Sequence, residues 1–465
     1  MNKQWPKDVK DFSTKIFVNS NYKDFEYLGI HYLVTYYSEV YRSTFNKKKL
    51  YNATWKIWLL QLDIYLVAII FSFFSFLYWL IKPKSKKKIG LWSGDFYSKE
   101  NNADFRLGNL FNELNLKFSV IEFLRIKNTN RKRFYQNLWN RKRAVIYYDC
   151  FDPLFIPFTR KKKFKITLNE IHDKEIIEKY LQSRSRERYQ FKLYKKIFKK
   201  IQLDFFIPWE TSSRQIYMVA ASKKNNIKTI GFMHGLSFNS YMSYEHLDFY
   251  DSPIGPDYFI VWSEFWKKYF EKNSKLYPNL LDWGTLRNDT QKTREKRLSN
   301  KILYICEPLI EHHYLIDYIS ALSDKYGERL VFKLRDDQCS FYNSLIRSHP
   351  KLKSHNIELR PFDKCIHDYS ITVGSHSTAV VESSIYKIPF VAIYTKKWGD
   401  YFELFHEYPD FLAHSKEEML VKVEKHLNIP NNTELNELSI KYFGGNRNCS
   451  DKIIEIIQKN NFLIK

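Results

Sequence analysis

The sequence has 465 residues, which is more than one ordinary hydrophobic core accommodates and predicts two domains with additional segments. A hydrophobic content of 44% and an aromatic content of 18% exclude a generally disordered chain. The formal net charge is +24, but no nucleic-acid-binding motif accompanies it. We therefore expect the charge to face anionic lipid and anionic substrates rather than nucleic acid. The five cysteines form no CxxC pair, so neither a zinc site nor a disulfide framework is predicted.

An N-terminal arm, residues 1–54, precedes a strongly hydrophobic segment, residues 55–82, in which positions 64–81 carry no charge. Roughly 20 apolar residues cross a bilayer, so this segment predicts a transmembrane helix. Five lysines between residues 82 and 88 predict that the rest of the chain lies on the cytoplasmic side of the cytoplasmic membrane. The alternatives are a buried core helix and a helix that lies on the membrane surface. The arm itself suggests no function.

From residue 88 onward, short apolar runs alternate with amphipathic stretches of helix length, which is typical of parallel α/β structure. In the first half we expect strands at 88–94, 117–124, 144–149, 203–209, 227–233, 258–262 and 280–283, and helices at 105–114, 173–200 and 211–224.

The polar stretch 285–300 has no apolar periodicity and is expected to be a linker. Beyond it we expect strands at 301–306, 330–334, 357–359, 371–373 and 390–394, and helices at 314–326 and 377–386. The pattern therefore predicts an α/β protein with two Rossmann-like domains, residues 83–290 and 301–445, followed by a C-terminal helix at 446–465.

A cluster of hydroxyl side chains follows the apolar strand that ends near Gly374. Ser375, Ser377 and Thr378 stand at the start of the next helix, and Glu382 lies one turn inside it. A helix start offers free backbone N–H groups and the positive end of the helix dipole, both of which favour a phosphate. Ligands of open α/β sheets bind at the carboxyl ends of the strands. The alternative is an ordinary serine N-cap with a solvated glutamate.

The same segment resembles the donor-binding motif of the GT-B glycosyltransferases that build bacterial capsule, lipopolysaccharide and teichoic-acid polymers. Those enzymes show a Gly-x-Ser-Thr-Ala helix start, a glutamate soon after it, and a Gly/Lys-x-Pro turn into an apolar strand. Ser377-Thr378-Ala379, Glu382 and Lys387-Ile388-Pro389 occur here in that order. In the position where many relatives carry Lys-x-His-Pro, Lys333 is present and Arg335 replaces the histidine. Arginine suits bidentate contact with phosphate.

The first half carries the matching elements of the resemblance. His234-Gly235 follows an apolar strand, as in the superfamily, and Gly284 with Asp289 resembles the turn before the linker. The resemblance covers about residues 200 to 395. It implies two Rossmann-like domains that face each other across a cleft, the acceptor domain first and the nucleotide-sugar donor domain second.

The implied reaction moves a sugar from a nucleotide-activated donor to a lipid-linked or surface polysaccharide acceptor. His234 would be the general base, because its unperturbed pKa lies near neutrality, and Asp95 is a second candidate. Lys333, Arg335, Ser375, Ser377 and Thr378 would bind the donor phosphates, and Glu382 would position the donor. No DxD-type motif is present, so we expect no metal and no cofactor.

Two other functions remain open. A teichoic-acid-type enzyme that transfers a polyol phosphate from a CDP-polyol would use a similar fold and a His-Gly motif. A catalytically inactive, membrane-anchored scaffold of a glycan-assembly complex would keep the fold without the chemistry. The site residues also have structural alternatives: His234 could pack at the domain interface, Asp95 could cap a turn, and Arg335 could pair with a neighbouring aspartate.

Overall fold

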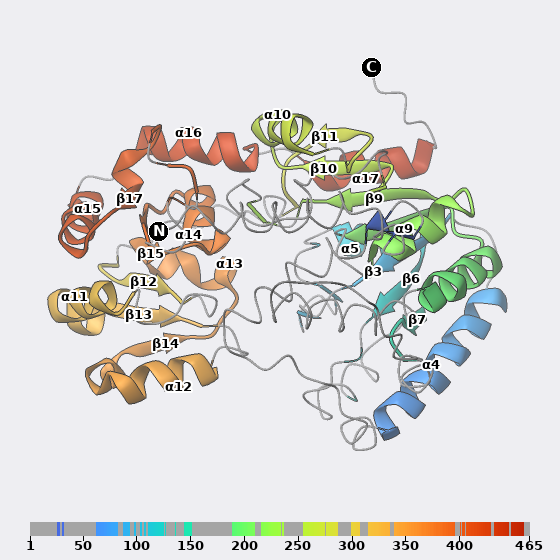
Figure 1. Ribbon diagram of the computed structural model, residues 1–465, viewed down its shortest axis with the longest axis horizontal. Coiled ribbons are helices and arrows are strands. Elements are labelled where there is room, and N and C mark those ends of the chain that lie inside the picture. The colour runs from blue at the N-terminus through green and yellow to red at the C-terminus, as the bar shows by residue number, and fades with distance from the viewer. Residues whose placement is uncertain are drawn as a thin grey trace, which may run out of the picture. The chain divides into compact units, whose positions relative to one another are not determined.

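The fold was analysed in a computed structural model of the chain (Figure 1). The structure describes residues 26–27, 30–31, 62–81, 87–93, 97–98, 103–104, 107, 110–124, 126, 135, 144–150, 188–209, 215–233, 235–236, 254–274, 276–286, 299–306, 315–334, 339–395, 400, 402–404, 406–428, 432–445 and 448–459.

Seven described strands form a first parallel sheet in the order β11-β10-β9-β8-β3-β6-β7. Strands β6 and β7 follow β3 on one side, and β8 to β11 then extend the sheet on the other side of β3, as in a Rossmann sheet. The strands are β3 (Lys88–Trp92), β6 (Ser119–Leu124), β7 (Ala144–Tyr147), β8 (Phe205–Trp209), β9 (Lys228–Phe232), β10 (Tyr258–Val261) and β11 (Leu280–Asp282).

Helices accompany this sheet. They are α4 (Leu62–Ile81), α5 (Leu110–Lys117), α9 (Gln215–Lys223), α10 (Glu264–Asn273), and a helix over residues 188–201. Two of them differ from the expectation. The helix expected at 105–114 begins at Leu110, because Gly108 disfavours a helix interior. The unexpected α10 begins where the Ser263 hydroxyl accepts a hydrogen bond from the Trp266 N–H at 3.5 Å.

Six described strands form a second parallel sheet in the order β14-β13-β12-β15-β16-β17. They are β12 (Ile302–Ile305), β13 (Leu330–Lys333), β14 (Asn356–Glu358), β15 (Ile371–Gly374), β16 (Phe390–Ile393) and β17 (Leu412–Ala413). The strand order again reverses once, between β12 and β15. The expected parallel α/β organisation with two Rossmann-like sheets is confirmed.

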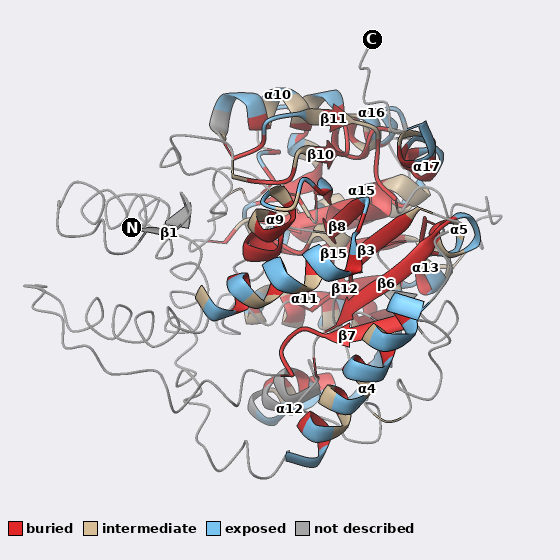
Figure 2. Ribbon diagram, turned by 90° about the vertical axis from the view of Figure 1, so that its right-hand side faces the viewer, coloured by how far each residue is buried: buried red, intermediate tan, exposed pale blue. Residues whose placement is uncertain are grey.

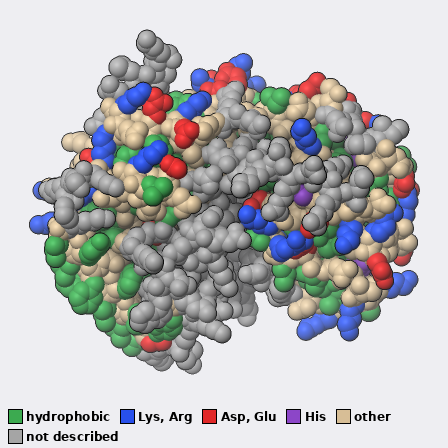
Figure 3. All heavy atoms as spheres, turned by 180° about the vertical axis from the view of Figure 1, so that it is seen from behind, with side chains coloured by type: hydrophobic (Ala, Val, Ile, Leu, Met, Phe, Trp, Pro, Cys, Tyr) green, Lys and Arg blue, Asp and Glu red, His purple; other side chains and the backbone are tan. Residues whose placement is uncertain are grey.

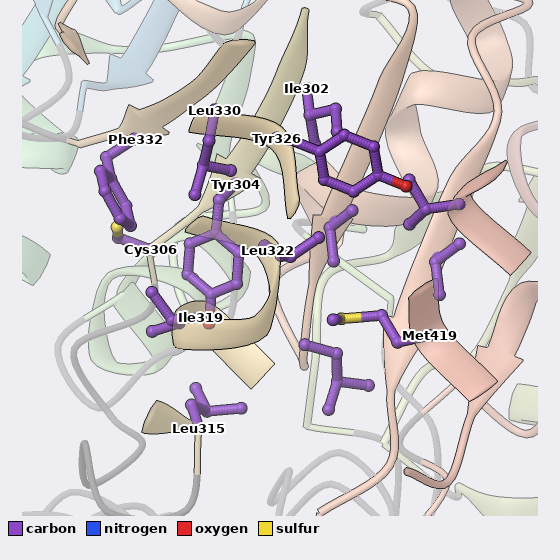
Figure 4. Close-up of a cluster of buried hydrophobic side chains, with 14 of the residues drawn as sticks. Ile302, Tyr304, Cys306, Leu315, Ile319, Leu322, Tyr326, Leu330, Phe332 and Met419 are labelled. Atoms are coloured by element: carbon purple, nitrogen blue, oxygen red, sulfur yellow. The ribbon is translucent and has the colours of Figure 1, made fainter. Parts of the chain in front are cut away.

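The helices of this second part of the chain are short to medium in length. They are α11 (Ile316–Tyr326), α12 (Cys339–Ser348), α13 (Phe362–Cys365), α14 (Thr378–Glu382), α15 (Lys416–Asn428) and α16 (Asn432–Phe443). Figure 4 shows the core between β12, β13 and the helices α11 and α15. Tyr304 and Phe332 meet edge to face at 5.8 Å, and Leu322 and Met419 pack in the same cluster. Apolar burial of this kind is the main stabilising contribution.

The hydrophobic helix α4 packs along the edge strand of the first sheet. Ile64, Tyr65 and Ala68 share a buried cluster with Val145 and Tyr147. The Tyr147 N–H donates to the Ser72 hydroxyl at 2.9 Å. A backbone donor of the edge strand is therefore satisfied by a side chain of α4, which covers this edge. Figure 2 shows the buried and exposed sides of the helix.

The chain divides into two compact units, one around each sheet. The described residues 235–236 belong with the described residues from 299 to 445 and the second sheet, whereas residues 448–459 belong with the first sheet. In that last segment, α17 (Cys449–Lys459) buries its apolar face, and the Lys87 ammonium donates to the carbonyls of Ile457 and Gln458 at 2.7 and 2.8 Å. A lysine at a helix C-terminus also complements the helix dipole.

Candidate functional site

The candidate site of the second unit lies where its strand order reverses. β15 ends at Gly374, beside the carboxyl end of β12, and Ser375, His376 and Ser377 follow directly. The carboxyl edge at such a reversal is where open α/β sheets bind ligands. The polar cluster predicted from the sequence therefore lies at the topological position that favours binding.

The polar cluster is almost completely buried. Ser375, His376 and Ser377 are 3%, 5% and 6% exposed, and the Ser375 hydroxyl lies 3.3 Å from Nδ1 of His376. Ser377 is the N-cap residue of α14, yet its side chain makes no capping hydrogen bond. A serine at this position usually accepts from the first turn of the helix. Its hydroxyl here is not engaged in capping, so a ligand can use it.

Gly374 lets the strand approach the helix that follows. A Cβ atom at this position would lie 2.6 Å from Cγ2 of Val380 and 3.2 Å from the carbonyl oxygen of Ile305. Because Gly374 has no side chain, the backbone of the polar turn can lie directly against β12 and α14. Any larger residue would move the turn or the strand.

Glu382 lies at the last position of α14 and is 8% exposed. A hydroxyl relay fixes this part of the helix: the Thr372 hydroxyl donates to the Ser383 hydroxyl at 3.0 Å, which donates to the Val380 carbonyl at 2.8 Å. Lys387 then takes a left-handed conformation with φ of 57°. Glycine adopts that conformation most readily, so Lys387 carries a conformational cost at this position.

Lys333 ends β13, the strand on the other side of β12, so it shares the carboxyl edge with the polar cluster. It is partly buried, and its ammonium donates to the Leu334 carbonyl at 2.8 Å. One strand lies between β13 and β15, and neighbouring strands are about 4.8 Å apart. Lys333 is therefore close enough to add positive charge to a ligand held at the β12–β15 reversal.

The carboxyl end of β14, further along the same edge, is closed by internal ion pairs. The Arg360 guanidinium contacts the Glu358 carboxylate through both oxygens and donates to Asp368 at 2.9 Å. Burial alone would raise the pKa of Glu358, but hydrogen bonds from Arg360 and Tyr369 outweigh it and hold the pKa below its usual value. Burial raises the pKa of the neighbouring Cys365 thiol to about 12, so this thiol is not a nucleophile near neutrality.

The residues after the His-Gly motif approach α14 within the second unit. The Leu236 N–H donates to the Thr378 hydroxyl at 3.4 Å, and a Cβ at Gly235 would lie 3.3 Å from the same oxygen. The sequence motifs at residues 235 and 378, which are 143 positions apart, are thus brought together. Thr378 accordingly acts as an anchor for this segment as well as a candidate ligand group.

The first unit carries a carboxylate that the sequence reasoning missed. Glu122, in β6, is completely buried and accepts a hydrogen bond from the Ser93 hydroxyl at 2.7 Å. Ser93 directly follows β3, at the carboxyl edge of the first sheet. A buried carboxylate is costly unless it is hydrogen-bonded, so a glutamate within an apolar strand was the available signal.

The predicted site residues fall into two groups. Ser375, Ser377, Thr378 and Glu382 lie in one polar segment of the second unit, and Lys333 ends a nearby strand. His234, Asp95 and Arg335 lie outside the described residues. Among the residues that the structure describes, no group of three or more His, Cys, Asp or Glu side chains could hold a metal ion.

Known structures with a similar fold were found, although the chain matches no protein-family model and no curated protein. The S. aureus MnaA structure with UDP has a TM-score of 0.51 at 11% identity and covers 82% of this chain and 98% of its own. A UDP-N-acetylglucosamine 2-epimerase has a TM-score of 0.50 at 13% identity, with the same coverages. MurG from Acinetobacter baumannii has a TM-score of only 0.44 at 10% identity, over 80% of this chain and 99% of its own.

Identities this low establish the fold alone, because one fold hosts many chemistries. In this chain the fold consists of two Rossmann-like α/β sheets, each with its strand order reversed once. The chain thus has the GT-B-type fold of two parallel α/β sheets.

Proposed function

We propose that this protein is a glycosyltransferase that takes a sugar from a uridine-nucleotide donor and transfers it to a lipid-linked or surface polysaccharide acceptor. It would act on the cytoplasmic side of the cytoplasmic membrane. The neighbour solved with UDP supports the choice of nucleotide. The resemblance of residues 371–393 to the donor motif of GT-B glycosyltransferases supports transfer as the reaction.

The observation that carries the proposal is the buried polar turn at the β12–β15 reversal. Ser375 and Ser377 place hydroxyl groups there, and Ser377 does not use its hydroxyl to cap the helix. Lys333 adds a cation on the same edge of the sheet. Donors of this kind, in a water-poor position, suit the negative charge that develops on a leaving nucleoside diphosphate. Glu382 would accept from a ribose or sugar hydroxyl.

The acceptor hydroxyl must lose a proton as the new bond forms. His234 and Asp95 remain the candidate bases. Glu122 is completely buried, so we assign it a positioning role: it fixes Ser93, which stands two positions before Asp95 in the sequence. Ser93 follows β3, where the strand order of the first sheet reverses.

We further propose that transfer needs no metal, since Lys333 and Arg335 would neutralise the leaving group. Activity that disappears with a chelator and returns with Mg²⁺ would contradict this part of the proposal. It would leave the donor site itself intact.

The first experiment is a binding measurement with UDP by thermal shift and calorimetry. A ligand at 100 times its Kd adds about 2.7 kcal/mol of stability, which is easily observed. Ser377→Ala and Glu382→Gln should weaken UDP or UDP-sugar binding. Ser354→Ala and Glu417→Gln, at exposed positions of the same unit, should leave it unchanged. Normal nucleotide binding by Ser377→Ala and Glu382→Gln would refute the assigned site.

The second experiment separates the possible reactions. UDP-sugar is incubated with and without membrane lipid extract, and the products are analysed by mass spectrometry. UDP release that requires the extract supports transfer, whereas a change of the donor sugar without the extract indicates an epimerase. Binding of CDP-polyols in preference to UDP-sugars indicates polyol-phosphate transfer. A protein that is folded but binds no nucleotide would favour the alternative function as a catalytically inactive scaffold.

A further inference from the structure

Helix α4 exposes many large apolar side chains on its outer side. Leu66, Ile70, Phe73, Phe74, Tyr78 and Ile81 are exposed, with Phe74 62% and Ile81 82% exposed. Figure 3 shows an extended hydrophobic surface on this part of the molecule. Exposed apolar patches of this kind mark interaction sites, because water solvates them poorly.

The inner side of the same helix combines the large residues Ile64, Tyr65 and Trp79 with Ala68, Ser72 and Ser75, all of them buried. The Ser72 hydroxyl accepts from the Tyr147 N–H, and the Trp79 indole donates to the Ile201 carbonyl at 3.4 Å. A surface helix of a water-soluble protein carries polar residues on its outer side, where α4 carries large apolar ones. The outer face of α4 is therefore built for an apolar environment.

Packing along α4 restricts how a membrane can contact it. Buried contacts with the first unit extend from Ile64 to Trp79, which is about 22 Å of helix. A helix that crossed the bilayer would carry β7 and the residues around Asp149 into the hydrocarbon. Sheet edges and charged groups are not stable there. If α4 lies parallel to the surface, only its outer face enters the lipid.

A basic surface lies next to α4. The helix over residues 188–201 exposes Lys192, Lys195, Lys196, Lys199 and Lys200, and it ends at Ile201, whose carbonyl accepts from Trp79 of α4. Juxtaposed lysines attract the anionic headgroups of a bilayer. An apolar helix face beside a lysine-rich helix face matches the boundary between acyl chains and headgroups.

We propose that α4 is an interfacial helix that docks the first unit on an anionic membrane, lies parallel to its surface, and does not cross it. The occupant of the apolar face is the lipid bilayer. Tyr78 and the lysines of residues 188–201 contact the headgroups, and Phe73 and Phe74 enter the acyl region. The proposal does not rest on the sugar-transfer reaction.

The first test is flotation of the full chain, purified in detergent, with vesicles. Vesicles of phosphatidylethanolamine and phosphatidylglycerol should bind the protein, and pure phosphatidylcholine vesicles should bind it much less. The double variant Phe73→Gln/Phe74→Gln should reduce vesicle binding at least tenfold. The triple variant Lys195→Gln/Lys196→Gln/Lys199→Gln should reduce it by a similar factor.

Two matched controls replace exposed residues of the second unit and should bind vesicles normally. They are the double variant Val421→Gln/Ile440→Gln and the triple variant Lys351→Gln/Lys353→Gln/Lys416→Gln.

The second test distinguishes a helix that lies parallel to the membrane surface from one that crosses the bilayer. Nitroxide labels at positions 66, 73 and 81 should report the same shallow depth in the bilayer. A depth that is greatest at position 73 and small at both ends would show a membrane span and overturn the proposal. Vesicle binding that the Phe73/Phe74 variant leaves unchanged would overturn it as well. Circular dichroism and melting curves establish that each variant is folded.

Discussion

The two sheets share one strand order but carry different chemistry at the point where that order reverses. In the first sheet the reversal lies between β3 and β8, and the nearby polar groups are the buried Glu122 and Ser93. In the second sheet it lies between β12 and β15, where hydroxyl groups of Ser375 and Ser377 lie on the same edge as Lys333. An acidic group therefore marks one reversal, and hydroxyl groups with a cation mark the other.

This difference indicates a division of tasks between the units. Hydroxyl groups and a lysine favour an anion, which suits a nucleotide phosphate. A buried acidic group does not favour an anion, but its hydrogen bond can hold a neighbouring residue such as Ser93 in place. Substitutions in the second unit should thus change donor binding, whereas substitutions at Glu122 should change turnover.

The largest effect is expected from substituting Gly374, which ends β15 and precedes the polar turn of the candidate site. Gly374→Val would force a side chain into Val380 and the Ile305 carbonyl, and overpacking costs about 1–3 kcal/mol. Calorimetry should show a destabilised protein that no longer binds UDP. Gly90→Val, which would meet Leu203 at 2.6 Å in the first sheet, is the matched variant. Loss of UDP binding only in the Gly90 variant would contradict the division of tasks.

The next effect concerns the Ser377 hydroxyl. One hydrogen bond to a charged group contributes about 1.5–3 kcal/mol, so Ser377→Ala should raise the donor Kd by roughly tenfold or more. Turnover at saturating donor should change less than KM. Titration calorimetry and donor-dependent kinetics measure the two quantities. A variant with normal KM but lost turnover would place the serine in the chemistry rather than in donor binding.

The substitution Glu122→Gln tests the role of the first unit in the same comparison. The amide keeps the shape of the side chain and replaces its carboxyl group. We expect kcat to fall by up to about 100-fold, because a small displacement of a catalytic group such as Asp95 has effects of that size. The donor Kd should stay the same. If the variant binds UDP-sugar less tightly, Glu122 belongs to the donor site and the division of tasks is wrong.

The smallest effect is a pH dependence of the second unit. Burial lowers the pKa of His355 and His426, so the folded state binds their protons less readily than the unfolded state does. The two neutral histidines therefore contribute fully to the free energy of unfolding above about pH 6.5, the approximate pKa of histidine in the unfolded state. This contribution is lost as the pH falls from there through the pKa of the folded state. The free energy of unfolding should decrease between pH 6.5 and 5 in urea titrations. His355→Gln with His426→Gln should flatten that slope, and an unchanged slope would exclude these histidines as its source.

The alternation of apolar runs and amphipathic stretches was sufficient to predict both sheets except the short edge strand β17, because strands buried on two faces are almost continuously hydrophobic. β6, with its sequence Ser119–Leu124, is buried at every position and was expected within one or two residues of its bounds. Helix α10 was missed, since its first turn mixes Glu264 with aromatic residues and depends on the Ser263 cap.

The sequence by itself determined the two α/β halves, the hydroxyl cluster at residues 375–378, and the position of the hydrophobic helix. Each of these depends on local order and periodicity along the chain. Only the tertiary structure decided that Glu122 reaches Ser93 and that α4 turns its serines inward. Both depend on which strands and helices become neighbours, and those long-range contacts are set by packing between segments far apart in the sequence.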